Sequence, residues 1–386
     1  MKVTILAHTP EPEKTVAAAA RLCYSKISAT QIMENFSQEK ATSFIKKLMD
    51  MGHMSPMEHV SFTFAIDGVS RTLLAQITRH RIASYSVQSL RYNNPFDEEI
   101  SLEVSDDDST SENVSYLEGL LLATKLSGQK VNVNPSLIEK NHIKGQTPEN
   151  IIDLHKPSYI RGIFDGAGML SESPDNPGFS IAFPLELESI LRDTHFNIIS
   201  SDTKLLIKNE SALNFVRYIY GNLDFAVSLY SEDKLLGFCN KNAQLNEEIL
   251  SIMQNFIDQK YYAMAPESIS KSTKALLTYI KGLDACKKHY IDLIRAGIDQ
   301  EDARYILPLG TQTRLVMTMN VRSLYNFFNL RCCERAQTEI RQLANLMLAE
   351  VKKIAPSLFE KAGAPCEKLG YCPEGDFGCG KYPPSK

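Results

Sequence analysis

The stretch RHRIASYSVQSLRY, Arg79–Tyr92, concentrates bases and hydroxyls in a way that an ordinary surface segment does not. Arg79, His80 and Arg81 stand side by side, and serine and tyrosine hydroxyls follow them at short intervals. A solvated helix face would mix acids among its bases, because like charges on one face repel each other. The stretch therefore predicts a site for an anionic ligand.

The residues that precede this stretch are typical of a compact α/β unit, which extends to about residue 96. A short apolar strand is expected at 2–9. Prolines and acids then begin a segment of strong helix formers, and this order favours a helix over 10–24.

A strand and a helix are predicted to lead directly into the basic stretch. Residues 60–68 alternate apolar and polar side chains, the period of a half-buried strand. A helix is expected over 70–80, with Ser70 as its N-cap and an apolar stripe on one side. Arg79 and His80 should then lie at the C-terminal end of that helix.

The C-terminal third predicts long helices, over 270–297 and over 314–355. Polar groups interrupt the second, and two interpretations are open: a solvated face, or the ligand-facing side of a largely buried helix. The apolar residues around them favour the second interpretation. These polar residues are Asn320, Arg322, Asn326, Arg331 and Arg335.

Composition restricts the class of protein. The chain has 386 residues, of which 43% are hydrophobic, enough for two or three globular units. Runs of about 20 apolar residues are absent and the first residues do not form a signal peptide, so a cytoplasmic protein without a membrane segment is expected. Its eight cysteines indicate reduced thiols or metal ligands rather than disulfides.

Charge divides the chain into two chemically different parts. Residues 97–258 contain 12 Lys and Arg against 26 Asp and Glu, a net charge of −14. The remainder contains 30 basic and 20 acidic residues, a net charge of +10. We therefore expect three stretches of chain: 1–96, an inserted domain at 97–258, and 259–386.

Five segments resemble the flavin-dependent thymidylate synthases, and they occur in that family's order. The basic stretch fits the family signature, Arg-His-Arg followed by seven residues and a serine, here Ser89. The resemblance covers roughly residues 1–96 and 260–386, and it implies an α+β fold in which long helices flank a mixed sheet. The segments are GHMSPMEHVSFTFAIDGVSR (52–71), RHRIASYSVQSLRY (79–92), EDARYILP (301–308), TMNVRSLYNFFNLR (318–331) and AQTEIRQLANLM (336–347).

The resemblance also implies an activity. This family methylates dUMP to dTMP, with methylenetetrahydrofolate as the carbon donor and NADPH as the reductant, through FAD. Each of these ligands is anionic, so a part with net charge +10 that presents guanidinium groups suits them. Family members are homotetramers with active sites between subunits, and we expect the same here.

Site residues carry over one position at a time. Arg331 resembles the arginine that polarises the uracil, a role in which a guanidinium can donate two hydrogen bonds to developing negative charge. The family's flavin contacts match His53, Ser55, Arg79, His80, Arg81, Asn320, Arg322 and Asn326. The nucleotide contacts match Gln76, Arg79, Ser89, Arg91, Arg304 and Arg331.

Two groups of cysteines suggest other chemistry. Cys332 and Cys333, beside Arg331, raise the alternative of a thiolate nucleophile, but their apolar setting and the resemblance favour inert thiols. Three tail cysteines could bind zinc or remain free, and we expect no metal because four ligands are usual and no histidine lies near. The tail cysteines are Cys366, Cys372 and Cys379.

The acidic part, 97–258, resembles a degenerate LAGLIDADG homing-endonuclease domain of α/β type. Residues 114–128 and 158–170 resemble its two motif helices, but Thr124 and Ala167 stand where the metal-binding acids are required. A net charge of −14 also makes nucleic-acid binding by this domain unlikely, because phosphate contacts need Lys or Arg.

Two competing interpretations remain. The chain could be a DNA-binding or homing-endonuclease protein that uses the synthase part as a scaffold. Alternatively, the inserted domain, which enters shortly after Arg91, could block the synthase site.

Overall fold

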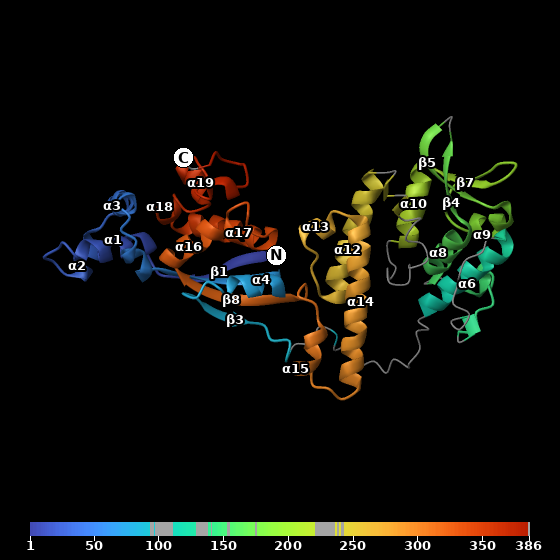
Figure 1. Ribbon diagram of the computed structural model, residues 1–386, viewed down its shortest axis with the longest axis horizontal. Coiled ribbons are helices and arrows are strands. Elements are labelled where there is room, and N and C mark those ends of the chain that lie inside the picture. The colour runs from blue at the N-terminus through green and yellow to red at the C-terminus, as the bar shows by residue number, and fades with distance from the viewer. Residues whose placement is uncertain are drawn as a thin grey trace. The chain divides into compact units, whose positions relative to one another are not determined.

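The computed structural model describes residues 1–92, 96, 111–128, 138–139, 141–152, 155–173, 176–220, 236–237, 239–240 and 243–384. Residue contacts divide the chain into two compact units. The first unit comprises Met1–Pro95, Tyr262–Pro266 and Leu307–Lys386, and the second comprises Phe96–Tyr261 and Glu267–Ile306 (Figure 1).

A four-stranded antiparallel sheet forms the centre of the first unit. Its order is β1 (Lys2–His8), β2 (Ser61–Ser70), β8 (Gln312–Asn320) and β3 (Ser84–Val87). β2 pairs with β8 although about 250 residues separate them in the sequence, and Phe64 lies opposite Met317. The sheet thus joins the two ends of the chain into one unit.

The helix predicted over 314–355 is wrong at its start and in its continuity. Residues 312–320 form the strand β8, in which buried and less buried side chains alternate. Met317 is fully buried, whereas Val316 is 37% exposed on the other face. The helical part is also interrupted, because α16 (Val321–Arg331) and α17 (Thr338–Ile354) are separate helices.

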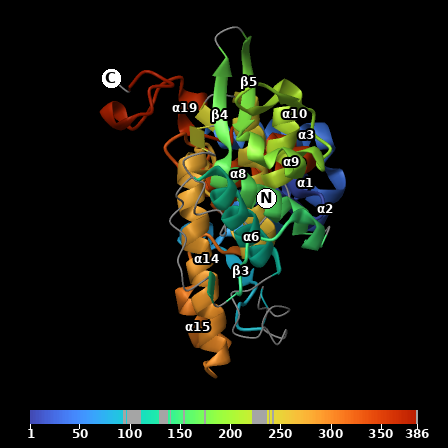
Figure 2. The ribbon, with the colours of Figure 1, turned by 90° about the vertical axis from the view of Figure 1, so that its right-hand side faces the viewer.

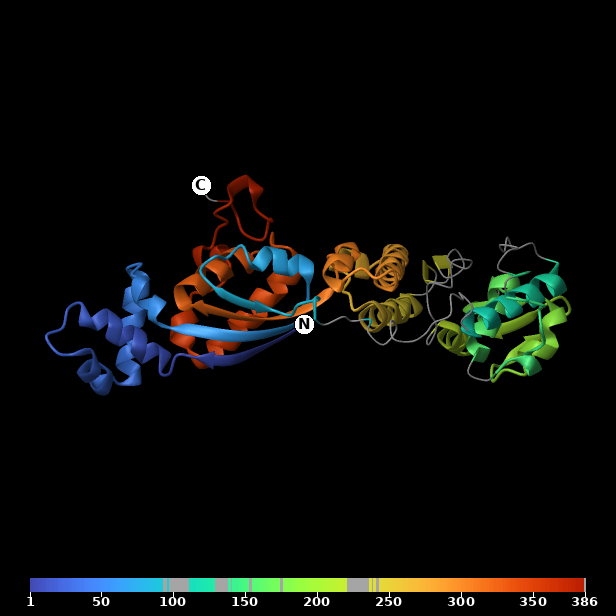
Figure 3. The same ribbon diagram turned by 90° about the horizontal axis from the view of Figure 1, so that it is seen from below.

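Apolar side chains on one face of this sheet build the core of the first unit with the C-terminal helices. Phe62 lies edge-on to Phe359 of α18 (Pro356–Phe359), with ring centroids 5.6 Å apart. Figure 3 shows the orange and red helices lying along the sheet. The large aromatic area buried there accounts for much of the unit's stability.

The predicted N-terminal elements of the first unit are confirmed. The helix expected over 10–24 is α1 (Pro12–Leu22), and the one expected over 70–80 is α4 (Arg71–Ile77). Ser70 is its N-cap, since its hydroxyl accepts a hydrogen bond from the Leu73 amide. The other helices of the unit are α2 (Ala29–Asn35), α3 (Gln38–Asp50), η1 (Ser55–His59), α19 (Pro365–Leu369) and η7 (Gly375–Phe377).

The second unit contains two helices in close contact and a second four-stranded antiparallel sheet. The helices are α6 (Ser111–Ser127) and α8 (Lys156–Ala167). The sheet order is β4 (Met169–Ser173), β5 (Asn176–Phe183), β7 (Leu205–Lys208) and β6 (Ile198–Ser200). Shorter elements here are η2 (Pro148–Asn150), η4 (Leu185–Leu187), α9 (Glu188–Arg192) and α10 (Asn209–Tyr220).

A long helical pair also belongs to the second unit. α12 (Ala243–Tyr261) packs against α14 (Thr273–Arg295), the long orange helix of Figure 2. α14 is the helix predicted over 270–297, and that prediction is confirmed. The expected domain boundary after residue 258 falls inside α12. The remaining elements are α13 (Glu267–Ser270), α15 (Gln300–Ala303) and η6 (Arg304–Ile306).

None of the helices in the described ranges combines the length and the apolar character that spanning a membrane requires.

Candidate functional site

The turn after α4 carries the first group of site residues. The Tyr85 hydroxyl lies 2.7 Å from the Ile77 carbonyl oxygen and 2.9 Å from that of His80, and it donates toward both. This contact ties the turn to β3. Ser70, at the other end of α4, donates from its amide and its hydroxyl to the carboxylate of Glu339 on α17. The helix that leads into Arg79 is therefore held at both ends.

The start of α16 carries the second group. Asn320 ends β8 and caps α16, because its Oδ1 accepts a hydrogen bond of 2.8 Å from the Ser323 amide. One side of the helix is buried through Leu324, Phe327 and Phe328. On the opposite side Arg322 and Leu330 are exposed, so α16 is half-buried and not buried on most sides as the sequence suggested. Its polar residues Arg322 and Asn326 nevertheless line a pocket.

These two groups meet around one pocket of about 1000 Å³. The pocket brings together residues more than 200 positions apart in the sequence, because β2 and β8 are neighbours in the sheet. Its lining residues are Glu58, Arg79, His80, Arg81, Ile82, Asn320, Arg322, Ser323, Asn326, Leu330 and Arg331.

The lining of this pocket is strongly cationic. Four arginines border it, whereas Glu58 is the one carboxylate among the described residues of its lining, and Glu58 forms an ion pair with Arg322. Burial, and then the neighbouring charge of Arg79, lower the pKa of Arg331 from its usual value. Unlike-charged ligands would relieve the repulsion among these arginines, so the pocket favours anions such as phosphates.

His80 lies against Arg331 in this pocket. Its Nε2 is 3.1 Å from the Nε of Arg331, and its ring packs edge-on against Phe327 with centroids 5.0 Å apart. Burial, followed by the charge of Arg331, lowers the pKa of His80 from 6.5 to about 4. The imidazole is therefore neutral at pH 7.

The pocket collects seven of the residues predicted as ligand contacts, and the others lie elsewhere. Ser89 accepts a hydrogen bond from the Arg91 amide, and the Arg91 guanidinium stacks 5.7 Å from the Tyr92 ring centroid. Arg304 belongs to the second unit, where its Nε donates to the Glu301 carbonyl. In the lining are Arg79, His80, Arg81, Asn320, Arg322, Asn326 and Arg331, whereas His53, Ser55, Gln76, Ser89, Arg91 and Arg304 are outside it.

Four lining residues were not predicted from the sequence: Glu58, Ile82, Ser323 and Leu330. Glu58 lies in η1, three positions after Ser55, inside a segment that already suggested a contact. The presence of His53 and Ser55 in the same segment is the sequence signal that could have suggested Glu58. Ser323 and Leu330 follow from the helical spacing of Asn326 once α16 is known to begin at residue 321.

Cys332, which follows Arg331, is not arranged for nucleophilic chemistry. Cys332 follows the last residue of α16 instead of lying within the helix, and burial raises the pKa of its thiol to about 12. A protonated, buried thiol is a poor nucleophile. The inert interpretation of Cys332 therefore has a physical basis.

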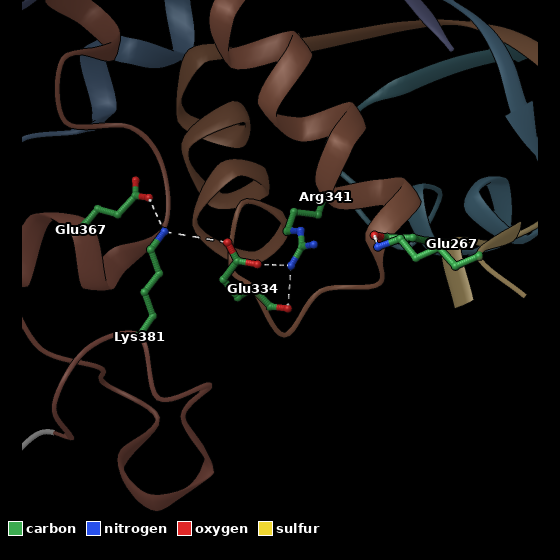
Figure 4. Close-up of polar contacts among 6 residues, drawn as sticks. Glu267, Glu334, Arg341, Glu367 and Lys381 are labelled. Atoms are coloured by element: carbon green, nitrogen blue, oxygen red, sulfur yellow. Dashed lines mark hydrogen bonds and ion pairs between the residues drawn. The ribbon is translucent and has the colours of Figure 1, made fainter. Parts of the chain in front are cut away.

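The C-terminal tail is attached to the turn after α16 by ion pairs. Lys381 lies 3.8 Å from Glu334 and 3.6 Å from Glu367, and Arg341 also contacts Glu334 (Figure 4). Such exposed pairs contribute little each, about 1 kcal/mol or less. Over the part of the chain that the structure describes, no three His, Cys, Asp or Glu side chains are grouped so as to hold a metal ion.

Most of the chain is similar to known thymidylate synthases. The family model described as "Thymidylate synthase complementing protein" matches residues 4–147 and 241–357. A flavin-dependent thymidylate synthase of Clostridium tetani is 30% identical over 381 residues, 99% of this chain and 94% of that protein. One from Geobacter sulfurreducens is 28% identical over the same shares.

The chain also aligns with a solved structure of such an enzyme. The Helicobacter pylori enzyme ThyX, complexed with FAD and dUMP, aligns with 94% of this chain and 100% of its own, at 17% identity and a TM-score of 0.40. The two long alignments continue through residues 97–258, whereas the family match is interrupted from 148 to 240.

Proposed function

The chain belongs to the family of flavin-dependent thymidylate synthases, and on that premise we propose that it methylates dUMP to dTMP with methylenetetrahydrofolate and NADPH as co-substrates and FAD as cofactor. The observation that carries the proposal is the cationic pocket, where Arg79–Arg81 of the family signature meet residues of α16. Four guanidiniums around one cavity provide charge-assisted donors for several phosphate groups at once.

The pocket has the donors that FAD requires. Arg79, Arg81 and Arg322 are suited to its diphosphate, and the side-chain amides of Asn320 and Asn326 can bond to a polar ring or ribose edge. When bound, FAD supplies the hydride chemistry of the reaction. The protein's own groups bind and orient the ligands and balance their charge.

Arg331 is assigned to the nucleotide. Its guanidinium reaches the pocket from the C-terminal end of α16, where burial and Arg79 disfavour its charge in the ligand-free site. A uracil ring that gains negative charge during the reaction would stabilise the charged guanidinium of Arg331 and accept two hydrogen bonds from it. Gln76, Ser89, Arg91 and Arg304 remain proposed nucleotide contacts, and His53 and Ser55 remain proposed flavin contacts.

Because family members place their active sites between subunits, we propose a homotetramer. Residues that lie outside the pocket of one chain would then contribute to the site of a neighbouring copy. Sedimentation equilibrium measures the mass directly. A monomer of about 43 kDa at micromolar concentration would contradict this assembly.

We further propose that 97–258 is a degenerate LAGLIDADG-like domain. Its two candidate motif helices, α6 and α8, pack through glycines: a Cβ at Gly162 would lie 2.7 Å from the Leu120 amide nitrogen, and one at Gly166 would lie 2.8 Å from the Ala123 Cβ. Small residues at such crossings are what that helix pair requires.

Two observations support an inactive state of this domain. Thr124 and Ala167 carry no carboxylate at the positions that would hold a metal. Asp165, the nearby acid, is instead buried, accepts a hydrogen bond of 2.8 Å from Tyr116 and lies 3.8 Å from the Nε of Arg161. Buried charges in proteins are either paired or coordinate metals, and this carboxylate is paired with a guanidinium.

The second sheet also argues against the rival DNA-binding function. Ile181 and Ile207 on its inner face are fully buried. On the other face, one row crosses all four strands and consists of uncharged residues: Met169, Ala182, Leu206 and Ile199. The next row of the same face carries Lys208, opposite Ser180, but one cation supplies few of the Lys or Arg contacts that phosphates need.

The decisive experiment is to purify the intact chain and measure tritium release from ring-labelled dUMP with NADPH and methylenetetrahydrofolate. Release that requires FAD supports the synthase. A folded chain that binds FAD but not dUMP would favour a nucleotide site blocked by its own inserted domain. Retention on DNA of a defined sequence, with no flavin bound, would favour the nuclease-like alternative.

A further inference from the structure

The contact between His80 and Arg331 determines which hydrogen atoms the imidazole carries. The guanidinium has N–H groups only, so it can donate but not accept. Its Nε lies 3.1 Å from His80 Nε2, and that nitrogen must therefore accept the hydrogen bond. An imidazole that accepts through Nε2 carries its single proton on Nδ1.

We infer that His80 is a positioning residue for Arg331: its neutral Nδ1–H tautomer holds the guanidinium through Nε2 in the orientation that binds the nucleotide. This inference rests on the proposed function, because the orientation matters only if Arg331 contacts the substrate. It goes beyond the flavin contact that family resemblance assigns to His80.

The rest of His80 is fixed by contacts that leave the ring little freedom. The edge of the ring lies against Phe327, one turn before Arg331 on the same helix. Its backbone carbonyl accepts from the Tyr85 hydroxyl, and its amide donates to the Ile77 carbonyl at 3.0 Å. Because the backbone and the contact with Phe327 fix the ring of His80, its Nε2 can in turn fix the flexible side chain of Arg331.

The surrounding charges favour the neutral ring. The charged groups around the pocket are Arg79, Arg81, Arg322 and Arg331, with Glu58 paired to Arg322, and Tyr85 stays neutral because burial raises its pKa to about 12. A protonated His80 would place another cation beside Arg331 and would have no lone pair for its Nε–H. Acid should therefore release the guanidinium.

Selective ¹⁵N-histidine labelling of the ligand-free chain tests the tautomer without any activity. We expect, at pH 7, a set of signals with a bare Nε2 and a protonated Nδ1 that vanishes in His80→Gln. His8 and His289 also point their Nδ1 at a carbonyl oxygen, so any such signals from them should persist in the variant. A protonated Nε2 in the signals that the variant loses would overturn the inference. A wild-type chain that binds neither FAD nor dUMP would contradict the proposed function, yet this spectrum would still report on His80.

Binding of dUMP to the FAD-loaded chain tests the positioning role. His80→Gln keeps an acceptor, its amide oxygen, whereas His80→Phe keeps an aromatic ring but no acceptor. We expect dUMP affinity within about threefold of wild type for the first and at least about tenfold weaker for the second, the usual loss for a hydrogen bond to a charged group. Equal affinity of the two variants for dUMP would contradict the inference.

The pH dependence of the same binding provides a separate readout. Wild-type affinity should fall below about pH 5 more steeply than that of His80→Gln, which cannot be protonated. His289→Gln, on the exposed face of α14, is the matched control and should keep the wild-type profile. Identical acid profiles for wild type and His80→Gln would overturn the inference.

Discussion

At the scale of single residues, Arg331 links the two groups of pocket residues. We predict that Arg331→Ala weakens dUMP binding at least about tenfold and leaves FAD bound, because a lost charge-assisted contact costs about 1.5–3 kcal/mol. Flavin absorbance and calorimetric dUMP titration measure the two ligands separately. Arg21→Ala, at the exposed end of α1, is the control and should change neither. Loss of the flavin in Arg331→Ala would refute the division of roles.

His80 gives a stability prediction with a definite sign. Its pKa is about 4 in the folded chain and 6.5 ordinarily, so between these values the unfolded chain binds a proton that the folded chain does not. Stability from this group is complete above pH 6.5 and is lost as the pH falls to 4. The full shift corresponds to about 3 kcal/mol, which screening at a half-exposed ring reduces to about 1–2 kcal/mol.

Urea unfolding at pH 7 and pH 4.5 measures this loss. We expect wild type to lose about 1 kcal/mol more than His80→Gln between the two pH values, since only wild type carries the titrating ring. Subtracting the variant removes the contribution of the other groups that titrate in this range. An equal loss in both proteins would show that His80 is not depressed in the folded state.

At the scale of elements, two glycines in helices of the second unit have opposite roles. Gly162 in α8 lies so close to α6 that a Cβ would enter the contact distance of the Tyr116 carbonyl oxygen and the Leu120 amide nitrogen. Both obstacles are backbone atoms, which cannot rotate away. Gly282 in α14 would place its Cβ in open space.

We therefore predict that Gly162→Ala destabilises the second unit by at least about 2 kcal/mol, whereas Gly282→Ala stabilises it by up to about 1 kcal/mol through helix propensity. Thermal unfolding followed by circular dichroism compares the two variants. Unfolding of Gly162→Ala at the wild-type temperature would mean that α6 and α8 are not in close contact.

At the scale of the whole molecule, α12 decides how much of the second unit can be removed. Ile249, Met253 and Ile257 of α12 are buried on one face, and α14 buries a matching stripe that includes Leu276 and Ile280. A deletion of 97–258 would remove most of α12 and leave the apolar face of α14 in water. A deletion of 97–241 would keep the helical pair intact.

We predict that a chain with a short Gly/Ser linker in place of 97–241 stays in solution and binds FAD, whereas replacement of 97–258 causes aggregation. Size-exclusion chromatography and flavin absorbance of the two deletions, purified in parallel, test this. The reason is that exposed apolar surface costs about 25 cal/mol per Å². A well-behaved, flavin-binding 97–258 deletion would show that α14 does not depend on α12. Failure of both deletions to bind FAD would mean that the second unit has become part of the active site.

The family and the local elements around the basic stretch can be read from the amino-acid sequence alone. The signature from Arg79 to Ser89 depends on residue identity, and the Ser70 cap and the alternation at 60–68 depend on neighbours within a few positions, so all of them are legible along the chain. Charge counting likewise separated an acidic segment from the rest.

The strand conformation of β8 and the set of residues that share the pocket depend on contacts between distant parts of the chain. The apolar residues of 314–320 continue toward α16 and so predict a helix. Their strand conformation instead depends on pairing with β2, about 250 residues earlier. The same pairing brings His80 to Arg331 and Glu58 to Arg322. Neither strand shows along the chain which partner it will pair with, since that is decided by the sheet and the packing that join them.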